Sequence, residues 1–329
     1  MKIQLPDAKK AAKAAKRAAL QKLADAVKEA DELDPSEALA PFLAKPFVRN
    51  GLSTSVEAVT HASALSAADR KWMWNLLEKN MKPVYGSQAW KKEGKEKKEE
   101  MLSDEARFLV ARNAETPSEG CENTENVNPN EPLGFVHYRF VVEEGAAVLY
   151  VYELQIAPGA RRRGLGKFLM MLCESLARKA LVSGVVLTVQ TANAHATKFY
   201  ESMKYGVSPI SPRTCDPWAF EEGEYDYDIY QKVWGEGGAQ ALAAAGAAAF
   251  KENKEMFDAA SKEAADLRAE LGRAEKALEK ANGERDEWKA QARGLEIALG
   301  SAKQAQSAAE SGVKEVVRRA TVARPSKED

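Results

Sequence analysis

The pattern of hydrophobic and polar positions divides the chain into three parts. In residues 31–234, short runs of β-branched and aromatic residues alternate with segments that carry an apolar stripe at helical spacing, which predicts a mixed α/β domain. Residues 1–30 are rich in Ala and Lys and predict a basic helix. Residues 235–329 predict a linker and then a helical extension, because the apolar positions from Phe250 to Leu299 follow the spacing of a coiled-coil seam.

The most informative stretch of the middle part is a strand, a loop and a helix in succession. An apolar strand over 148–156 leads through Pro158 and Gly159 into the loop Arg161-Arg162-Arg163-Gly164-Leu165-Gly166, and a helix is predicted over 167–179. The first N–H groups of a helix have no partner and meet an anion together with the positive end of the helix dipole. Glycines allow close backbone approach and arginines add charge, so we interpret the segment as a phosphate-binding loop.

Single residues disfavour two alternatives for this loop. A P-loop requires Lys after its second glycine, but Gly164 is followed by Leu165. A dinucleotide-binding loop requires a small residue three positions after Gly166, where this chain has Leu169. A third interpretation, in which the glycines only ease a tight turn, stays open.

The R-x-x-G-x-G pattern at 161–166 resembles the pyrophosphate loop of the GNAT acyl-CoA-dependent N-acetyltransferases. A second apolar strand over 184–190, followed by Asn193 and a helix over 194–201, adds to the resemblance. It implies a mixed sheet flanked by helices, whose two central strands splay apart to admit acetyl-CoA, with no metal. The residues that the resemblance assigns to the cofactor are Leu154, Gln155, Ile156, Arg162, Arg163, Gly164, Leu165, Gly166, Lys167 and Asn193.

Within GNAT, residues 30 to 234 most resemble the NatD family of histone N-terminal acetyltransferases, through segments such as 97–101, 138–140 and 162–169. The resemblance implies acetylation of the free N-terminal amine of the tails of histone 4 and histone 2A, which begin Ser-Gly-Arg-Gly. It implies a catalytic group of Glu153 as general base with Tyr150 and Tyr152. The residues that it assigns to the peptide are Tyr85, Trp90, Glu143, Tyr152, Thr188, Ser211 and Tyr227.

The strand period tests the catalytic assignment. Tyr150 and Tyr152 share one face of a regular strand and Glu153 points to the other, unless a bulge re-aims it. The alternative is an edge carboxylate beside two core tyrosines. Tyr200 lies where many GNAT enzymes place an acid, but the adjacent Phe199 favours an aromatic packing pair.

Charge bears on the choice of substrate. Six acids and no Lys or Arg lie between Asp216 and Asp228, which would attract a basic peptide, although an acidic surface loop looks the same. NatD-type enzymes carry an acid two positions before Glu143, where this chain has Val141, so part of the arginine-reading charge is missing. An insertion before Tyr225 leaves open whether Tyr225 or Tyr227 meets the peptide.

Composition narrows the remaining choices. The three cysteines are scattered, the three histidines have no ligand-like spacing, and no apolar run approaches the ~20 residues that span a bilayer, so we expect neither a zinc site nor a membrane partner. We expect the protein to be located in the nucleus and cytoplasm. For the basic helix we expect either a role in nuclear import or nucleic-acid contact, or only packing on the domain. For the helical extension we expect self-association or binding of a partner.

Two further functions stay open at this point. One is acetylation of internal lysines or small amines by the same kind of domain. The other is a scaffold in which the helical extension dominates and the GNAT domain is vestigial.

Overall fold

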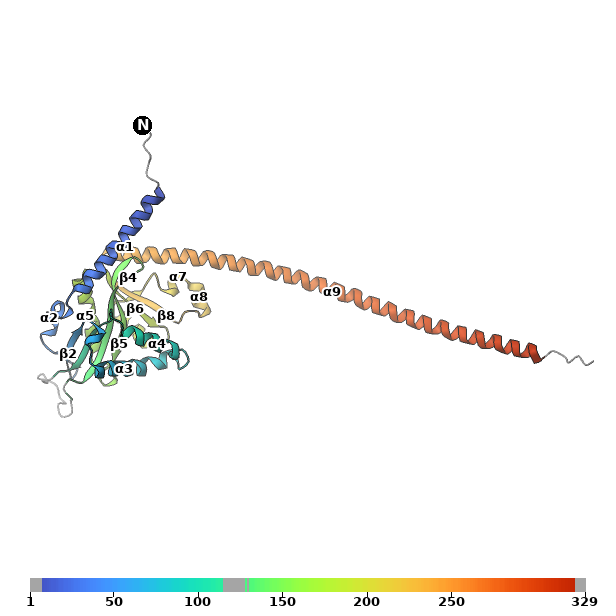
Figure 1. Ribbon diagram of the computed structural model, residues 1–329, viewed down its shortest axis with the longest axis horizontal. Coiled ribbons are helices and arrows are strands. Elements are labelled where there is room, and N and C mark those ends of the chain that lie inside the picture. Colours follow the sequence, from blue (N-terminus) through green and yellow to red (C-terminus); the bar gives the residue numbers. More distant parts are fainter. Residues whose placement is uncertain (1–7, 115–127, 129, 323–329) are drawn as a thin grey trace, which may run out of the picture. The chain divides into compact units, whose positions relative to one another are not determined.

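The computed structural model describes residues 8–114, 128 and 130–322. The chain divides into two compact units, Met1–Phe257 and Asp258–Asp329. The first unit contains an eight-stranded sheet in the order β1-β2-β3-β4-β5-β6-β8-β7, in which β5 and β6 are parallel and the other neighbours antiparallel (Figure 1). The strands are β1 Phe47–Arg49, β2 Leu52–Val59, β3 Arg107–Asn113, β4 Pro132–Glu143, β5 Ala146–Ile156, β6 Gly184–Gln190, β7 Gly206–Val207 and β8 Tyr227–Val233.

Helices cover both faces of this sheet. The helices are α1 Ala8–Glu32, α2 Pro35–Leu43, α3 Ala67–Tyr85, α4 Trp90–Met101, α5 Leu165–Lys179, α6 Ala194–Ser202, α7 Pro212–Cys215, α8 Pro217–Glu222 and α9 Glu236–Val322. Residues of α1, α2 and α5 share one hydrophobic core with the sheet, and residues of α3 and α4 share another on the opposite face. The expected mixed sheet flanked by helices is confirmed.

The predicted helix after the loop packs as its apolar stripe requires. Its buried residues recur at helical spacing and face Leu149 and Val151 of β5 in one core. α1 also packs on this face through Leu23 and Val27, although Leu20 is exposed. The second half of this helix therefore packs on the domain, whereas its basic side chains from Lys10 to Lys22 are exposed. A role of the helix beyond packing stays a prediction.

A β-bulge in β5 decides which face Glu153 occupies. His137 of β4 pairs with Glu153 while the next residue of β4, Tyr138, pairs with Val151, so Tyr152 is an extra residue on β5. Leu149 and Val151 before the bulge face the α5 side, and so does Leu154 after it. The bulge thus shifts the alternation by one, which places Glu153 on the same face as Tyr150 and Tyr152.

The parallel strands β5 and β6 separate close to this bulge. They pair at only three positions, ending with Val151 opposite Leu187, although β5 continues to Ile156 and β6 to Gln190. Beyond that point the facing edges of the two strands have no strand partner in the described residues. The expected splay of the two central strands is present.

The start of α9 differs from the expected linker. α9 begins at Glu236, and its first turns pack on the domain through Leu242, which is fully buried. A Cβ on Gly246 would lie 2.2 Å from the Pro209 carbonyl oxygen, so this glycine allows the close approach. Trp218 of α8 stacks on Phe257 at 5.1 Å, so the first part of the predicted seam contacts this domain instead of a partner helix.

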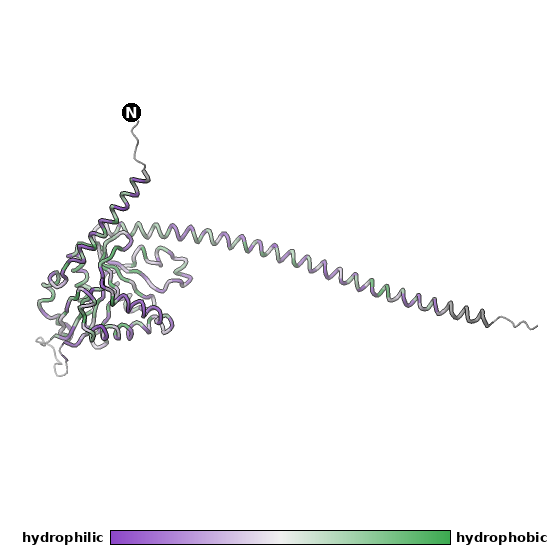
Figure 2. Tube along the Cα trace, in the orientation of Figure 1, coloured by the Kyte–Doolittle hydropathy of each residue, from purple (hydrophilic) through white to green (hydrophobic). Residues whose placement is uncertain are grey.

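The second unit is the rest of α9. Its large apolar side chains, among them Leu267, Leu278 and Trp288, are exposed, and hydrophobic and hydrophilic stretches alternate along the helix (Figure 2). Self-association through this seam stays a prediction. Of the three cysteines, Cys121 lies outside the described residues.

Candidate active site

A pocket opens where β5 and β6 part. It is bounded by the ends of these strands together with α3, α4 and α6. Its lining residues are Met81, Tyr85, Lys97, Val151, Tyr152, Glu153, Leu154, Gln155, Thr188, Val189, Gln190, Asn193, Ala196 and Tyr200. The structure therefore brings together most of the catalytic residues expected from the sequence with part of the cofactor set.

Glu153 lines this pocket and is only 6% exposed. One carboxylate oxygen accepts a hydrogen bond from Lys97 Nζ at 2.6 Å, and the other accepts from Gln155 Nε2 at 2.9 Å. The pKa of Lys97 is raised above its ordinary value, because burial, which disfavours the ammonium, is outweighed by the adjacent Glu153 charge. Lys97 belongs to a sequence segment singled out for resemblance, but its contact with Glu153 was not expected.

The two tyrosines expected beside Glu153 border the pocket or the adjoining surface. The Tyr150 hydroxyl and Thr188 Oγ1 are 2.5 Å apart, and burial raises the pKa of Tyr150 to about 12. Tyr152 stacks on His137 at 4.8 Å, and the Arg139 guanidinium lies 4.6 Å from its ring centre. Tyr150 is therefore a neutral hydroxyl at pH 7 and can donate a hydrogen bond.

The expected phosphate-binding loop has the backbone that such a site requires. Gly164 has a φ of +92° and caps the start of α5, and Arg162 also has a positive φ of 61°. The first helical bond of α5 is donated by the N–H of Phe168 to the Gly164 carbonyl oxygen. The N–H groups of residues 165–167 precede it and have no acceptor within the helix, which suits an anion.

Of the other residues expected to contact the cofactor, Leu154, Gln155 and Asn193 line the pocket. Asn193 lines the pocket and caps α6, where its side chain accepts a hydrogen bond from the Ala196 N–H at 3.2 Å. The side chain of Gln155 takes part in holding Glu153, a second use beside the expected main-chain role. Tyr200 lines the pocket, and burial raises its pKa; its ring packs against Phe199 at 5.1 Å, as the aromatic-pair interpretation expects.

The residues expected to bind the peptide are not all placed alike. Tyr85 and Thr188 line the pocket, and Glu143 and Tyr227 lie close enough to Tyr150 to affect its pKa. Trp90 is buried instead and stacks on Trp74 at 6.0 Å.

Ser211 is fully buried beside β8. Its hydroxyl donates to Asp228 Oδ1 at 3.0 Å and accepts from the Ile229 N–H at 3.1 Å. In this structure Trp90 and Ser211 are therefore buried in the domain and do not line the pocket.

The acidic segment before β8 is less open than its composition indicates. Asp228 is buried and forms an ion pair with Arg213 at 2.6 Å, and Asp216 caps α8. Glu221, Glu222, Glu224 and Asp226 are exposed. Four of the six acids thus remain available to a basic ligand.

The His137 ring is stacked between the rings of Phe108 and Tyr152. Neither of its ring nitrogens has a hydrogen-bond partner among the described residues, and burial, followed by the charges of Arg139 and Lys97, lowers its pKa well below the ordinary value. It is therefore neutral in the folded protein.

This histidine makes stability depend on pH. Below about pH 6.5 His137 binds a proton in the unfolded chain but stays neutral in the folded protein. The free energy of unfolding is therefore highest above that pH and decreases as the pH falls, by up to ~1.4 kcal/mol per pH unit. We expect His137→Phe, which keeps the stacked ring, to flatten this loss in urea unfolding between about pH 7.5 and 5.5. The exposed His195→Gln variant should keep the wild-type slope; an equal slope in all three proteins would contradict the prediction.

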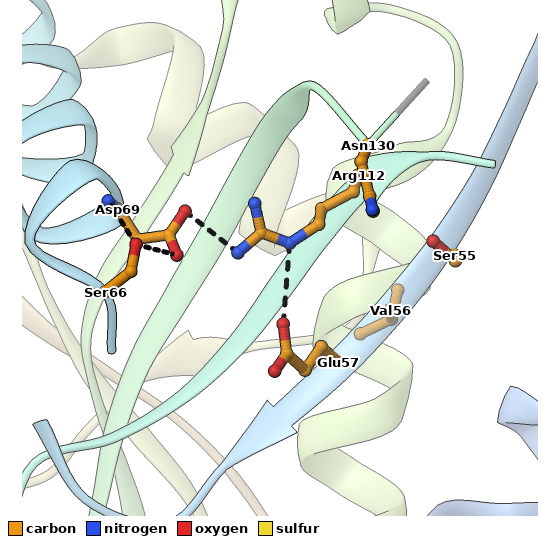
Figure 3. A pocket seen from close by; sticks show the side chains of 7 residues that line it. All are labelled: Ser55, Val56, Glu57, Ser66, Asp69, Arg112 and Asn130. Atoms are coloured by element: carbon orange, nitrogen blue, oxygen red, sulfur yellow. Dashed lines mark hydrogen bonds and ion pairs between the residues drawn. The ribbon is translucent and has the colours of Figure 1, made fainter. Parts of the chain in front are cut away.

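A second hollow lies between β2, β3 and the start of α3 (Figure 3). Its cation, Arg112, is held by Asp69 at 2.9 Å and by Glu57 at 3.4 Å. Because both contacts are with carboxylates, the arginine has little charge left for an anionic ligand. None of the expected site residues lines this hollow.

The described part of the chain offers neither a metal site nor a membrane span. No group of its His, Cys, Asp and Glu side chains could hold a metal ion. Among the helices that the structure describes, none is long and apolar enough to cross a membrane. Cys173 and Cys215 are both free thiols.

A family model and a curated protein match parts of this chain. Residues 75–205 match the model of the Acetyltransferase (GNAT) family. N-alpha-acetyltransferase 40 of Saccharomyces cerevisiae is 32% identical over 94 residues, which cover 26% of this chain and 33% of that protein. The alignment thus spans about a third of the curated relative's length.

Two solved structures with bound ligands are among those similar to this chain. PaiA N-acetyltransferase of Thermoplasma acidophilum, in complex with coenzyme A, is 16% identical and covers 55% of this chain and 99% of its own, with a TM-score of 0.36. Arabidopsis thaliana NAA60, in complex with a bisubstrate analogue, is 14% identical with the same coverages and a TM-score of 0.37.

Proposed function

We propose that the GNAT acetyltransferase domain contained in this chain transfers an acetyl group from acetyl-CoA to the free N-terminal amine of a basic peptide. The observation that carries the proposal is the β-bulge at Tyr152, which turns the buried Glu153 carboxylate into the pocket where β5 and β6 separate. The proposed peptides are the tails of histone 4 and histone 2A that begin Ser-Gly-Arg-Gly. Similarity to N-alpha-acetyltransferase 40 supports an N-terminal amine as the acceptor.

The residues present fit coenzyme A. The loop at 161–166 presents the start of α5 with two left-handed residues, and arginines stand beside it. The edge of β5 that faces β6 has no strand partner beyond Val151, so main-chain groups there can pair with amides, although the Ile156 carbonyl oxygen already accepts a hydrogen bond from Arg161 Nε at 3.0 Å. When bound, acetyl-CoA supplies the acetyl group as a thioester, which an amine can attack.

The side chains of the pocket can then accept a proton from the substrate amine and hold the peptide in position. An N-terminal amine is largely protonated at neutral pH, with a pKa of about 8, and must lose that proton before it reacts. Glu153 is the group placed to accept it, and neutral Tyr150 can hold the amine or the peptide carbonyl by hydrogen bonding. Holding the two reactants together contributes much of the rate in such a reaction.

Peptide selectivity follows from the charges around the opening. Glu143 and the four exposed acids before β8 favour a basic tail. Val141, where NatD enzymes carry an acid, packs in the same cluster as Leu242 of α9. A carboxylate at position 141 would lie partly buried against apolar atoms. We therefore propose that this protein is less selective for the peptide's arginine than NatD enzymes are.

A panel of peptides tests the proposed function. We expect acetyl-CoA consumption with free Ser-Gly-Arg-Gly peptides and none with the same peptide when its α-amine is blocked and a lysine is left free. Replacing the peptide's arginine by alanine should cost less than about 5-fold, the size of an exposed ion pair. Equal turnover of the blocked peptide would favour the lysine or small-amine alternative instead.

The scaffold alternative predicts no turnover with any member of the panel. The proposed substrate implies a protein of the nucleus and cytoplasm. Partner binding or self-association through the exposed seam of α9 belongs to the same proposal, and it is tested by the mass of the full chain in analytical ultracentrifugation.

A further inference from the structure

The proposed base does not stand alone in the pocket. Lys97 of α4 holds one oxygen of Glu153 at 2.6 Å, and the two side chains are 16% and 6% exposed. α4 is a strongly hydrophilic helix (Figure 2), and two other lysines of it, Lys92 and Lys95, are exposed and pair with acids of the same helix at 3.8 Å and 3.9 Å. Lys97 is distinguished from them by its contact across to the sheet.

The second oxygen of Glu153 is held by a chain of amides. Gln155 Nε2 donates to it at 2.9 Å, and Gln155 Oε1 accepts from Asn80 Nδ2 at 2.8 Å. Asn80 Oδ1 in turn accepts from Arg161, the first residue of the phosphate-binding loop. Both carboxylate oxygens are therefore fixed, and the fixing network reaches the cofactor side of the site.

The charge on Glu153 depends on Lys97. Burial of a carboxylate favours its protonated form unless an opposite charge lies beside it. The titratable or charged groups that face Glu153 from the elements around it are Lys97 and Glu100 on α4, Tyr85 on α3, Tyr200 on α6, and His137 and Arg139 on β4.

Lys97 is the member of this group that can stabilise the carboxylate. Glu100 carries a like charge, while Tyr85, Tyr200 and His137 are neutral at pH 7, and the Arg139 guanidinium lies over Tyr152. Among these groups, Lys97 alone forms an ion pair with Glu153 in the described residues.

We propose that Lys97 is a positioning residue, which keeps Glu153 ionised and, with the Asn80–Gln155 amide pair, aimed into the pocket. This inference rests on the proposed acetyl transfer with Glu153 as base. Without Lys97, the buried carboxylate retains a proton to higher pH and cannot accept one from the substrate amine.

Lys97→Met is the direct test, because it keeps the length of the side chain and removes its charge. We expect kcat on the free-amine peptide to fall by up to about 10-fold at pH 7 and the acid limb of the kcat/KM profile to move up by about one pH unit. The KM for acetyl-CoA should change little. Lys97→Arg should restore most of the rate, and Lys95→Met, an exposed lysine on the same helix, should leave it unchanged.

A double variant separates positioning from other effects. In a Glu153→Gln background, Lys97→Met should lower kcat no further, because its effect passes through the carboxylate. This double variant also removes the unpaired buried charge, so it reports even where Lys97→Met alone folds poorly. Losses that multiply, or a Lys97→Met enzyme with a wild-type acid limb and kcat, would overturn the proposal.

A readout without turnover keeps the two proposals distinguishable. In protein with ¹³C-labelled glutamate carboxyls, the Glu153 resonance is the one absent from Glu153→Gln. In Lys97→Met it should titrate at higher pH than in the wild type. If that shift occurs and the wild type acetylates no amine, the charge coupling holds and the proposed function fails; an unshifted titration overturns the positioning role whatever the activity.

Discussion

Replacing Glu153 by glutamine is expected to lower kcat by about 10²- to 10⁴-fold, the usual contribution of a general base. Glutamine has nearly the same shape, and its amide oxygen can still accept from Lys97. It cannot take a proton from the attacking amine at neutral pH. Acetyl-CoA consumption with a free-amine peptide measures the change.

Binding of coenzyme A should survive this change, because Glu153 is not part of the loop at 161–166. Calorimetric titration should give the same Kd for the variant and the wild type. Glu99→Gln serves as the matched control, since Glu99 lies on exposed α4 surface and pairs with Lys95 of the same helix at 3.9 Å. If Glu153→Gln turns over as fast as the control, Glu153 is not the base.

Gly164→Val is expected to weaken coenzyme A binding by at least about tenfold. Gly164 has a φ of +92°, and forcing a residue with a Cβ into the left-handed region costs roughly 1–2 kcal/mol, more for a β-branched side chain. A Cβ there would also lie 2.8 Å from Arg49 Cδ. The loop must therefore shift, and the N–H groups at the start of α5 lose their shared direction.

The same loop region offers a control. A Cβ on Gly159 meets no atom within 4 Å, and Gly159 has no positive φ, so Gly159→Ala should bind with the wild-type Kd. Circular dichroism of both variants establishes that the domain is folded. A folded Gly164→Val protein with unchanged Kd would show that this loop does not hold the diphosphate.

The local elements of the site could be read from the sequence. The strand, loop and helix over 148–179 follow from hydrophobic period and from turn residues that act within a few positions along the chain. The loop lies where it was expected and contains a left-handed glycine at position 164, and the helix begins at Leu165 instead of Lys167.

Relations between strands could not be read in this way. A period of two places Glu153 opposite the two tyrosines, and only the register shift against β4 reverses this. That shift depends on how two strands align over their whole length, so no residue of β5 reports it alone.

The burial of certain polar residues could not be predicted from the sequence for a similar reason. Asp228 and Ser211 read as an acid of a surface segment and a peptide-binding hydroxyl, yet they bond to each other across 17 positions. Likewise, Gly235–Gly238 has the composition of a linker, but Gly238 meets Ser183 closely where α9 packs on the domain. Such contacts depend on distant segments that composition does not pair.

The sequence by itself determined the mixed α/β fold class and the strand, loop and helix over 148–179, because these rest on local periodicity and on turn residues. Glu153 was singled out through the resemblance to the NatD family. The tertiary structure alone decided which face Glu153 occupies and which cation neutralises it. Lys97 and Glu153 lie 56 positions apart, and a helix with many lysines gives no sign of which one will be buried against a carboxylate. The packing of α4 against the sheet decides which lysine contacts Glu153, since Lys97 is the one lysine of α4 that lines the pocket.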